Sequence, residues 1–534
     1  MSAPCRCREI RRTIPPSPVR SDRHRFLCLR SFDRMDQRPP DGVVGIVAAV
    51  TAGAIDPLDV VTDAVERCRS AHAGLNALVQ PRGAAALEEA SRLADLPTGP
   101  LAGVPVSIKE CFPVRGMVTS LGLRSRRAAL DDGDAEIVTR LRAAGAIVIG
   151  KGNVPQALYL HETDNPVWGR TLHPTHTDRG PGGSSGGDAA LVAAGCVPLA
   201  IGNDLAGSIR QPAHACGIVG LLPRSATLGG GGAFETMPGL AGQRSRAGLL
   251  ARTVDDVAAG LRGLCGAPAD PAPQAEGLRV AWWDDAGPLA PSPAVRRAVA
   301  MAVERLAAAG ATVTRLDADI AAEAAWLHLG ILSADGGADI RRLFAGERPI
   351  DQVRRLLALA RIPGWARGLV AAACVWGGRG VEAKALRRTG PRGGAARDSL
   401  LSDRGAIDRI VSRWAAAHDC IVCPVSALPA LRHGTASRLL LAAAPCLLAN
   451  LLDLAAGAVP VTTVRADEES GRPRSYDPVE IAAIETDRGS AGLPVAVQVI
   501  ALDRRPGTAE ATVLTAMRVI AIEGRGSLTS PGVG

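Results

Sequence analysis

The sequence predicts one large α/β domain of the α/β/α type, in which helices surround a mixed β-sheet. Short apolar runs of strand length alternate with longer helical patterns along most of the chain. The 534 residues, 47% of them hydrophobic, are enough for a sizeable core, and no internal repeat indicates a solenoid. Aromatic residues make up only 3%, so that core must be built from Ala, Val and Leu.

The predicted domain spans residues 41–522 and begins with two helices. A strand follows them, and a third helix then leads to a second strand. A glycine- and serine-rich segment precedes the next strand, and the later strands have helices between them. In chain order we expect helices at 57–70 and 83–94, a strand at 104–108, a helix at 134–144, and strands at 146–150, 197–202, 278–283, 311–316, 420–425, 458–464 and 494–501.

The net charge of +8 is concentrated in the first forty residues. Residues 1–40 hold ten arginines and four acidic residues, a net +6, which leaves about +2 for the rest. A nearly neutral body excludes a basic surface for DNA or RNA. The Arg- and Pro-rich stretch 1–40 predicts a disordered tail, and 523–534 are expected to form a flexible C-terminal tail. Starts of translation at Met1 and at Met35 both fit this pattern.

The segment from Pro181 to Cys216 carries the strongest chemical signal. It places Ser184 and Ser185 in one glycine-rich turn and Ser208 in a second turn of small residues. A serine acts as a nucleophile when its hydroxyl is exposed on a tight turn, a base removes its proton and N–H groups face the developing oxyanion. A flexible linker is the alternative, but the apolar run that follows favours a helix leading into a buried strand.

A base for these serines is expected upstream, and lysine suits that role. The chain has three lysines, Lys109, Lys151 and Lys384, against 58 arginines. Burial can lower the pKa of a lysine until the amine is neutral, whereas arginine stays charged. Lys109 and Lys151 each follow a short apolar strand pattern, so the local residues alone leave both open as the base.

Several longer motifs resemble the amidase signature family of Ser-cisSer-Lys hydrolases, and its fatty acid amide hydrolase branch in particular. The likeness covers roughly residues 45–520. Motifs of this length in this order are far more specific than one short pattern. They comprise the spacing of Lys109, Ser184, Ser185 and Ser208, with PVSIKECF, NVPQ at 153–156, DNPVWGRTLHP, LSADGG at 332–337, AGAVPVTTV at 456–464 and GLPVAVQVIAL at 492–502.

The resemblance implies a role for each of these residues. Ser208 is expected to be the nucleophile, Ser184 a bridging serine with a cis peptide bond, and Lys109 the base. No cofactor is implied. The backbone N–H groups expected to hold the oxyanion are those of Leu205, Ala206, Gly207 and Ser208, and the residues expected to support the turn are Ser185, Asp204 and Arg210.

Two residues beside the predicted chemistry depart from the family pattern. Ala206 stands where the family usually has glycine, and Asn203 stands where it has threonine or serine. Because alanine reaches positive φ less easily than glycine, we expect a tighter or slightly misaligned oxyanion loop, with low activity or unusual substrates.

No metal site is predicted. His161, His173 and His176 lie close together in sequence, but their spacing fits no common ligand pattern. His214 follows Ser208 closely and is expected to pack behind the site, not to act as a base. The CxxC at 420–423 belongs to a buried strand pattern without a second pair, and the twelve scattered cysteines fit a reducing cytoplasm.

Two apolar segments bear on membrane contact. Residues 439–459 are interrupted by polar residues and a proline, which is typical of a buried helix entering a core strand. Residues 359–376 fit an interfacial helix and lie roughly where the fatty acid amide hydrolase branch has its membrane-binding cap; an ordinary core helix is the alternative. The side chains that favour an interfacial helix are Trp365, Trp376, Arg361 and Arg367.

The activity implied is hydrolysis of a carboxylic acid amide with an apolar acyl group, giving acid and amine or ammonia through an acyl-enzyme on Ser208. Two alternatives stay open: a glutaminase-type subunit of an amidotransferase, and a catalytically impaired family member that acts as a binding protein. The expected partner is a small-molecule amide. A homodimer, weak peripheral membrane contact through 359–376 and a cytoplasmic location are further expectations.

Overall fold

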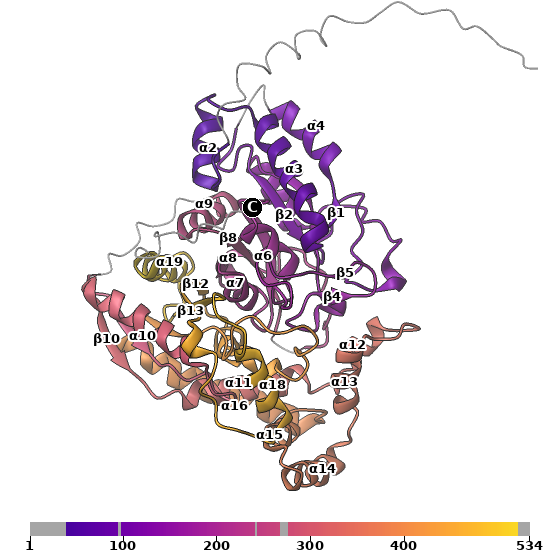
Figure 1. The fold of residues 1–534 in the computed structure, drawn as a ribbon, viewed down its shortest axis with the longest axis vertical. Coiled ribbons are helices and arrows are strands. Elements are labelled where there is room, and N and C mark those ends of the chain that lie inside the picture. The colour runs from indigo at the N-terminus through magenta and orange to yellow at the C-terminus, as the bar shows by residue number, and fades with distance from the viewer. Residues whose placement is uncertain (1–38, 94–97, 241–242, 267–275, 522–534) are drawn as a thin grey trace, which may run out of the picture. The chain divides into compact units, whose positions relative to one another are not determined.

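One mixed sheet of eleven strands runs through the protein and is surrounded by helices, which confirms the predicted fold class (Figure 1). The computed structural model describes residues 39–93, 98–240, 243–266 and 276–521. Those from Asp41 onward belong to one compact unit. The tail expected at 523–534, and all but the last two residues of the tail expected at 1–40, lie outside the described residues.

The strands of the large sheet lie in the order β1-β3-β2-β6-β8-β7-β12-β13-β11-β9-β10. The short strands β4 (Asp164–Asn165) and β5 (Gly169–Arg170) form a separate antiparallel pair. The eleven strands are β1 (Leu78–Pro81), β2 (Pro105–Lys109), β3 (Ile147–Gly152), β6 (Leu199–Asp204), β7 (Val219–Leu222), β8 (Arg246–Ala251), β9 (Arg279–Trp282), β10 (Thr312–Arg315), β11 (Cys420–Pro424), β12 (Ala456–Thr463) and β13 (Pro494–Ala501).

Helices fill the connections between these strands. Several begin at a polar side chain that accepts a hydrogen bond from the first turn: Asp56 caps α3 and Asp477 caps α18, each directly before a proline. The helices are α2 (Val43–Thr51), α3 (Pro57–Leu75), α4 (Gly83–Leu93), α5 (Glu136–Ala143), α6 (Gly186–Ala193), α7 (Arg210–Cys216), α8 (Ser225–Leu228), α9 (Val254–Cys265), α10 (Pro293–Ala308), α11 (Asp319–Leu332), α12 (Ala338–Leu343), α13 (Asp351–Ala360), α14 (Gly364–Trp376), α15 (Gly380–Arg388), α16 (Gly394–Ala417), α17 (Leu447–Leu451), α18 (Pro478–Asp487) and α19 (Thr508–Ala521).

The strands at the centre of the sheet are buried along their whole length. Every residue of β2, β3, β6, β7 and β8 is buried, so both faces of the sheet are covered. Continuous apolar runs are typical of such strands. This explains why the predicted strands in the buried part of the sheet were found where expected, including β11 with its buried CxxC.

Two parallel strand pairs determine where the predicted base lies. β2 runs parallel to β6, with Ile108 opposite Ile201, and parallel to β3 on its other side. Parallel neighbours end at the same edge of a sheet, so Lys109 at the end of β2 lies beside Asn203 near the end of β6. The fold therefore brings together residues that are 94 positions apart.

The apolar segment at 439–459 is a core element, as predicted. It forms a 3₁₀ helix at Leu440–Cys446, then α17, and enters β12. No single helix in the described ranges is long and apolar enough to cross a membrane, although α13 and α14 together have the required length and composition and are bent by 115° at their junction.

The segment at 359–376 matches neither sequence-based expectation in full, although its exposed apolar side chains agree with the interfacial one. It is not one helix, because α13 ends at Ala360 and α14 begins at Gly364. Nor is α14 an ordinary core helix, since several of its large apolar side chains are exposed. Figure 1 places α13 and α14 at one end of the ribbon, away from the central strands. The exposed side chains are Trp365, Leu369, Val375 and Trp376.

Arg367 does not face outward as an interfacial helix would require. Its side chain is buried and donates hydrogen bonds to the carbonyl oxygens of Leu386 and Leu359 at 2.9 and 3.0 Å. The expectation that Arg367 contacts anionic lipid is therefore wrong, because its guanidinium holds the ends of neighbouring helices together. Arg361, in contrast, is exposed.

Candidate active site

Lys109 is fully buried and contacts both Ser184 and Asn203. Its Nζ lies 2.6 Å from Ser184 Oγ, 2.6 Å from Asn203 Oδ1 and 3.3 Å from Asn203 O. A neutral amine has two N–H bonds and one lone pair. The two oxygens of Asn203 can accept both N–H bonds, which leaves the lone pair for the hydroxyl proton of Ser184.

The environment of Lys109 favours the neutral amine. Burial lowers the pKa of Lys109 to about 8, although nearby negative charges act in the opposite direction. Lys151 is also buried, but its Nζ lies 2.9 Å from Asp131 and 2.8 Å from Val118 O. A lysine paired with a carboxylate keeps its charge more readily. Lys109 and Lys151 share the same local sequence pattern, but only Lys151 is paired with a carboxylate. The third lysine, Lys384, is exposed.

The two serine turns are joined by a backbone hydrogen bond. The peptide bond Gly183–Ser184 is cis, as the resemblance implies. The N–H of Ser185 donates to Ser208 O at 3.2 Å. Ser185 lies at the start of α6, and a Cβ at Gly202 would lie only 2.6 Å from its Oγ, so glycine is required there.

Asp204 organises the loop that carries Ser208. Its carboxylate accepts hydrogen bonds from the N–H groups of Gly207 and Ile209 at 2.7 and 3.1 Å. Arg210 and Asn450 also donate to it, at 3.1 and 2.9 Å. Burial alone would raise the pKa of Asp204, but the charge and hydrogen bonds of Arg210 hold it well below its usual range. Asp204 is therefore an anion that holds the backbone of this loop, and its supporting role in catalysis stays a prediction.

Arg210 ties this loop to the rest of the core. Its guanidinium donates to Cys446 O at 2.9 Å, to Gln498 Oε1 at 3.0 Å and to Asn450 Oδ1 at 2.6 Å. Both Arg210 and Asp204 are completely buried. A buried ion pair with these additional hydrogen bonds is rigid because each polar atom has a partner.

Three of the four predicted oxyanion donors are available. In the described part of the chain, the N–H groups of Leu205, Ala206 and Ser208 donate no hydrogen bond. The N–H of Gly207 already donates to Asp204 Oδ1 at 2.7 Å. Its role as an oxyanion donor stays a prediction and would require that this hydrogen bond be shared.

Ala206 adopts a conformation that alanine reaches without strain. Positive φ falls on Gly207, at 95°, and not on Ala206. A Cβ at Gly207 would also lie 3.1 Å from Cβ of Cys446. The expectation that Ala206 tightens the loop through backbone strain is therefore wrong, because the glycine that the turn needs is the next residue.

His161, His173 and His176 each contact a backbone carbonyl group, and the rings of His173 and His176 also pack edge to face with centroids 5.7 Å apart. His161 Nε2 lies 3.0 Å from Ala206 O, and His173 Nε2 lies 2.8 Å from Ala215 O. His176 Nε2 lies 3.3 Å from Ala491 O. Within the described residues, no group of three or more His, Cys, Asp or Glu side chains could hold a metal ion. His214 lies between the carbonyl oxygen of Leu428 and the N–H of Ala496, and its expected place behind the site stays a prediction.

Sequence reasoning did not identify three residues that contact the loop or Arg210. Asn450 and Gln498 bind Arg210, and His328 Nε2 lies 3.0 Å from Leu205 O. His328 and Leu205 are 123 positions apart in sequence. No local pattern could have revealed this contact, which only the packing of α11 creates.

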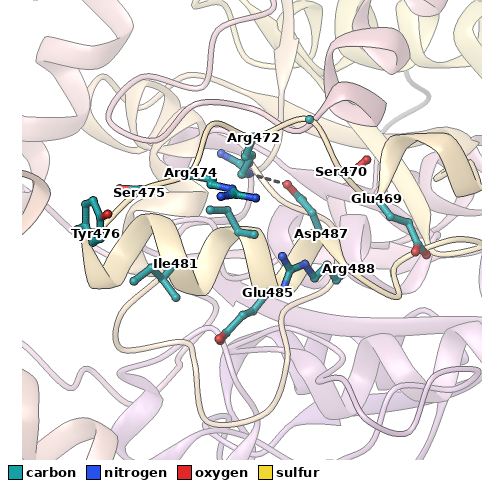
Figure 2. Close-up of a pocket in the computed structure, with 12 residues that line it drawn as sticks. Glu469, Ser470, Arg472, Arg474, Ser475, Tyr476, Ile481, Glu485, Asp487 and Arg488 are labelled. Atoms are coloured by element: carbon teal, nitrogen blue, oxygen red, sulfur yellow. Dashed lines mark hydrogen bonds and ion pairs between the residues drawn. The ribbon is translucent and has the colours of Figure 1, made fainter.

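A surface pocket lies apart from these residues (Figure 2). It lies between the loop 469–476 and α18, and none of the predicted site residues lines it. Arg472 and Asp487 form a nearly buried ion pair there, at 2.5 Å. Because Arg474 and Glu485 bring further charges of both signs, the pocket favours no single ligand charge.

Comparisons with known proteins agree with this geometry. The sequence pattern of the family described as Amidase matches residues 59–508. Fatty-acid amide hydrolase 1 of Sus scrofa is 32% identical over 435 residues, 76% of this chain and 73% of that protein. One subunit of the glutamyl-tRNA(Gln) amidotransferase of Rhodopirellula baltica is 35% identical over 226 residues, 41% of this chain and 44% of that protein.

A solved structure of fatty acid amide hydrolase has the same fold. It superposes with a TM-score of 0.78, covering 92% of this chain and 88% of that chain, at 19% sequence identity. The family match spans most of the domain that the structure describes. This chain therefore belongs to the amidase family, whose members are hydrolases that act on amide C–N bonds.

Proposed function

We propose that the domain at 41–522 hydrolyses carboxylic acid amides with an apolar acyl group, through an acyl-enzyme on Ser208. The contact between Lys109 Nζ and Ser184 Oγ, at 2.6 Å, carries this proposal. Among the described residues, no carboxylate lies within ion-pair distance of Lys109. A buried amine without a carboxylate partner is suited to act as a neutral base.

The first half of the reaction forms the acyl-enzyme. Lys109 accepts the proton of Ser184 while Ser184 accepts the proton of Ser208, and Ser208 Oγ adds to the amide carbonyl carbon. The protons then move back along the relay, one reaches the amide nitrogen, and the C–N bond breaks. The amine leaves and the acyl group stays on Ser208.

The second half repeats these steps with water. Water adds to the acyl carbonyl carbon while the relay accepts its proton, and the relay then returns a proton to Ser208 Oγ as the acid leaves. In both halves the oxyanion accepts hydrogen bonds from the free N–H groups of Leu205, Ala206 and Ser208. Asp204, Arg210 and Ser185 keep the two turns in place and do not react.

The proposed acyl preference rests on the relatives. The likeness to fatty-acid amide hydrolase covers more of the chain than the likeness to the amidotransferase subunit. The alternative of an impaired binding protein rests on the departures at Ala206 and Asn203, and the first of these causes no backbone strain. We therefore favour an amide hydrolase over both alternatives, and a cytoplasmic location and a homodimer stay predictions.

Fluorophosphonate labelling followed by peptide mapping tests the nucleophile. We expect one adduct, on Ser208, and none in Ser208→Ala, whereas Ser426→Ala, at a buried serine that follows β11, should label normally. Labelling that persists in Ser208→Ala would refute the assignment.

Turnover of amides of graded acyl length should increase with chain length. Labelling without turnover would instead favour a binding protein, and activity only with partner subunits would favour an amidotransferase.

We also propose weak peripheral membrane contact through α14. Its side chains of Trp365, Leu369 and Trp376 are 81%, 70% and 95% exposed. Aromatic and aliphatic side chains of this kind favour the headgroup boundary. Exposed Arg361 adds an attraction to anionic lipid.

Co-sedimentation with anionic liposomes tests this contact. Trp365→Asp/Leu369→Asp should abolish it without changing the melting transition, because both side chains are exposed. Val44→Asp/Leu130→Asp is the control, since those side chains are 47% and 65% exposed and neither lies on α14. Unchanged co-sedimentation of the α14 variant would exclude membrane contact through this helix.

A further inference from the structure

Two buried histidines from distant parts of the chain contact successive carbonyl groups of the oxyanion loop. His328, on α11, lies 3.0 Å from Leu205 O, and His161 lies 3.0 Å from Ala206 O. A carbonyl oxygen only accepts hydrogen bonds, so each Nε2 must carry the proton. We propose that His328 and His161 are positioning residues that orient the Leu205–Ala206 and Ala206–Gly207 peptide groups, and thereby aim the N–H of Ala206 at the oxyanion.

The direction follows from the geometry of a trans peptide group, in which C=O and N–H point in opposite directions. His328 holds Leu205 O, so the N–H of Ala206 in the same peptide group points away from α11. In the described part of the chain this N–H has no partner. It is thus held in direction but left free for a ligand.

The next peptide group is held at both ends. His161 holds Ala206 O, and the N–H of Gly207 in the same group donates to Asp204 Oδ1 at 2.7 Å. This group therefore cannot rotate without breaking two hydrogen bonds inside the core. Because it follows directly after the free N–H of Ala206, it limits how far that N–H can turn.

Packing of Ala206 supports the same conclusion independently. Its methyl group packs against a small cluster that contains Ala325 and has Leu329 at its edge, one turn apart on α11. His328 lies on that face of the helix. An alanine at position 206 thus fits the loop onto the helix that supplies the histidine, whereas a glycine would lack this contact.

The segment that carries His161 is also fixed by contacts with its neighbours. It packs against the serine turn, since a Cβ at Gly183 would lie 2.7 Å from Leu160 O. The neighbouring Glu162 accepts hydrogen bonds from Gly434 N at 2.9 Å and from Gln352 Nε2 at 2.8 Å. The 160–162 segment therefore contacts both the Ser184 turn and the oxyanion loop.

Both histidines are suited to a neutral, donating role. Burial lowers the pKa of His328 to about 4 and also lowers that of His161. Nδ1 of His328 is buried without a partner in the described residues, which disfavours a second proton. A neutral donor fixes the peptide group without adding a charge that would repel a proton on Lys109.

This inference rests on the proposed hydrolase activity, and the experiment separates the two. We would measure kcat and KM for His328→Leu and His328→Gln, and likewise for His161. Leucine removes the donor, and the amide of glutamine replaces it. We expect kcat to fall about a hundredfold in the leucine variants with KM nearly unchanged, and to recover to within about tenfold in the glutamine variants.

A trifluoromethyl ketone with the acyl chain of the substrate gives a second measurement. It forms a tetrahedral adduct on Ser208 that carries an oxyanion, so its affinity should fall in parallel with kcat/KM in the leucine variants. The affinity of the product acid should change little. Equal losses for both ligands would mean a general structural role and would overturn the inference.

The control is His173→Leu, which also removes a buried histidine from a backbone carbonyl, Ala215 O. It should lower the melting temperature without changing the ratio of the two affinities. If a leucine variant does not fold, the asparagine variant at the same position replaces it in the test. The asparagine amide is too short to reach the carbonyl oxygen, so this variant should also behave as a loss of the donor. Normal kcat in folded leucine or asparagine variants would refute this inference but not the proposed function. An inactive wild-type protein that is not labelled at Ser208 would refute the proposed function.

Discussion

Activity should rise with pH between 7 and 9, because Lys109 must be neutral to accept the proton of Ser184. Burial lowers the pKa of Lys109 to about 8. About one Lys109 in eleven is then neutral at pH 7 and about ten in eleven at pH 9, so kcat/KM should rise about tenfold between these values. The midpoint should lie near pH 8, well below that of an ordinary lysine.

Asp188 offers a way to move this midpoint. Ser107 Oγ donates to Asp188 Oδ1 at 2.8 Å, and Ser107 and Lys109 share one face of β2 because they are two residues apart. Burial raises the pKa of Asp188 to about 7, so near pH 8 it is mainly an anion that raises the pKa of Lys109. Asp188→Asn should therefore shift the midpoint to lower pH, while Asp256→Asn, at a distant capping carboxylate on α9, should leave it unchanged.

The assay is kcat/KM for an amide without ionisable groups, measured from about pH 6.5 to about pH 9.5, a range that brackets the expected midpoint. The rate of fluorophosphonate labelling should follow the same curve, since both reactions need the proton of Ser208 to be removed. A flat profile, or a rise centred near the ordinary lysine value, would refute the assignment of Lys109 as a neutral base. A midpoint that Asp188→Asn does not move would show that another group titrates.

Three further predictions concern the residues around the relay. Lys109→Arg should lose most activity at neutral pH, whereas Lys151→Arg should stay active because that position needs only a cation. The measurement is kcat/KM of both variants. An active Lys109→Arg enzyme would mean that Lys109 has a structural role and is not the base. Arg210→Met leaves Asp204 as an unpaired buried anion and should lower the free energy of unfolding by about 3–5 kcal/mol in denaturant titrations; a negligible change would mean that the pair contributes little. Ala206→Gly should lower kcat a few-fold through lost packing, and a higher kcat would restore the view that alanine impairs the loop.

The sequence predicted the fold class and the buried strands because these depend on local patterns. Strands such as β2 and β11 are apolar throughout most of their length, so their type and position can be read from a few consecutive residues. The local pattern does not predict β8, because this strand begins with Arg246 and arginine is rare in a buried strand. That guanidinium donates to the carbonyl oxygens of Pro223 and Leu454, both at 3.0 Å, and only the tertiary structure provides these acceptors.

The limits of sequence reasoning were different in the site. Lys109 and Lys151 have the same local pattern, and what separates them is a carboxylate, Asp131, that folding brings to one and not to the other. The outward face of α14 was anticipated from its tryptophans, but Arg367 was misplaced because a cation on an apolar helix can equally bind carbonyl groups inside. In each case the deciding partner is distant in sequence or on another element.

Asn203 illustrates how a departure from the family pattern can suit the proposed relay. Its side-chain and backbone oxygens both lie within hydrogen-bond distance of Lys109 Nζ, at 2.6 and 3.3 Å. Two acceptors match the two N–H bonds of a neutral amine, whereas a charged ammonium has three to place and would need Ser184 Oγ as its third acceptor. In that state Ser184 could not pass its proton to Lys109. The neutral amine uses Asn203 for both N–H bonds and keeps its lone pair for Ser184, so this one residue favours both the protonation state and the direction of proton transfer that the reaction requires.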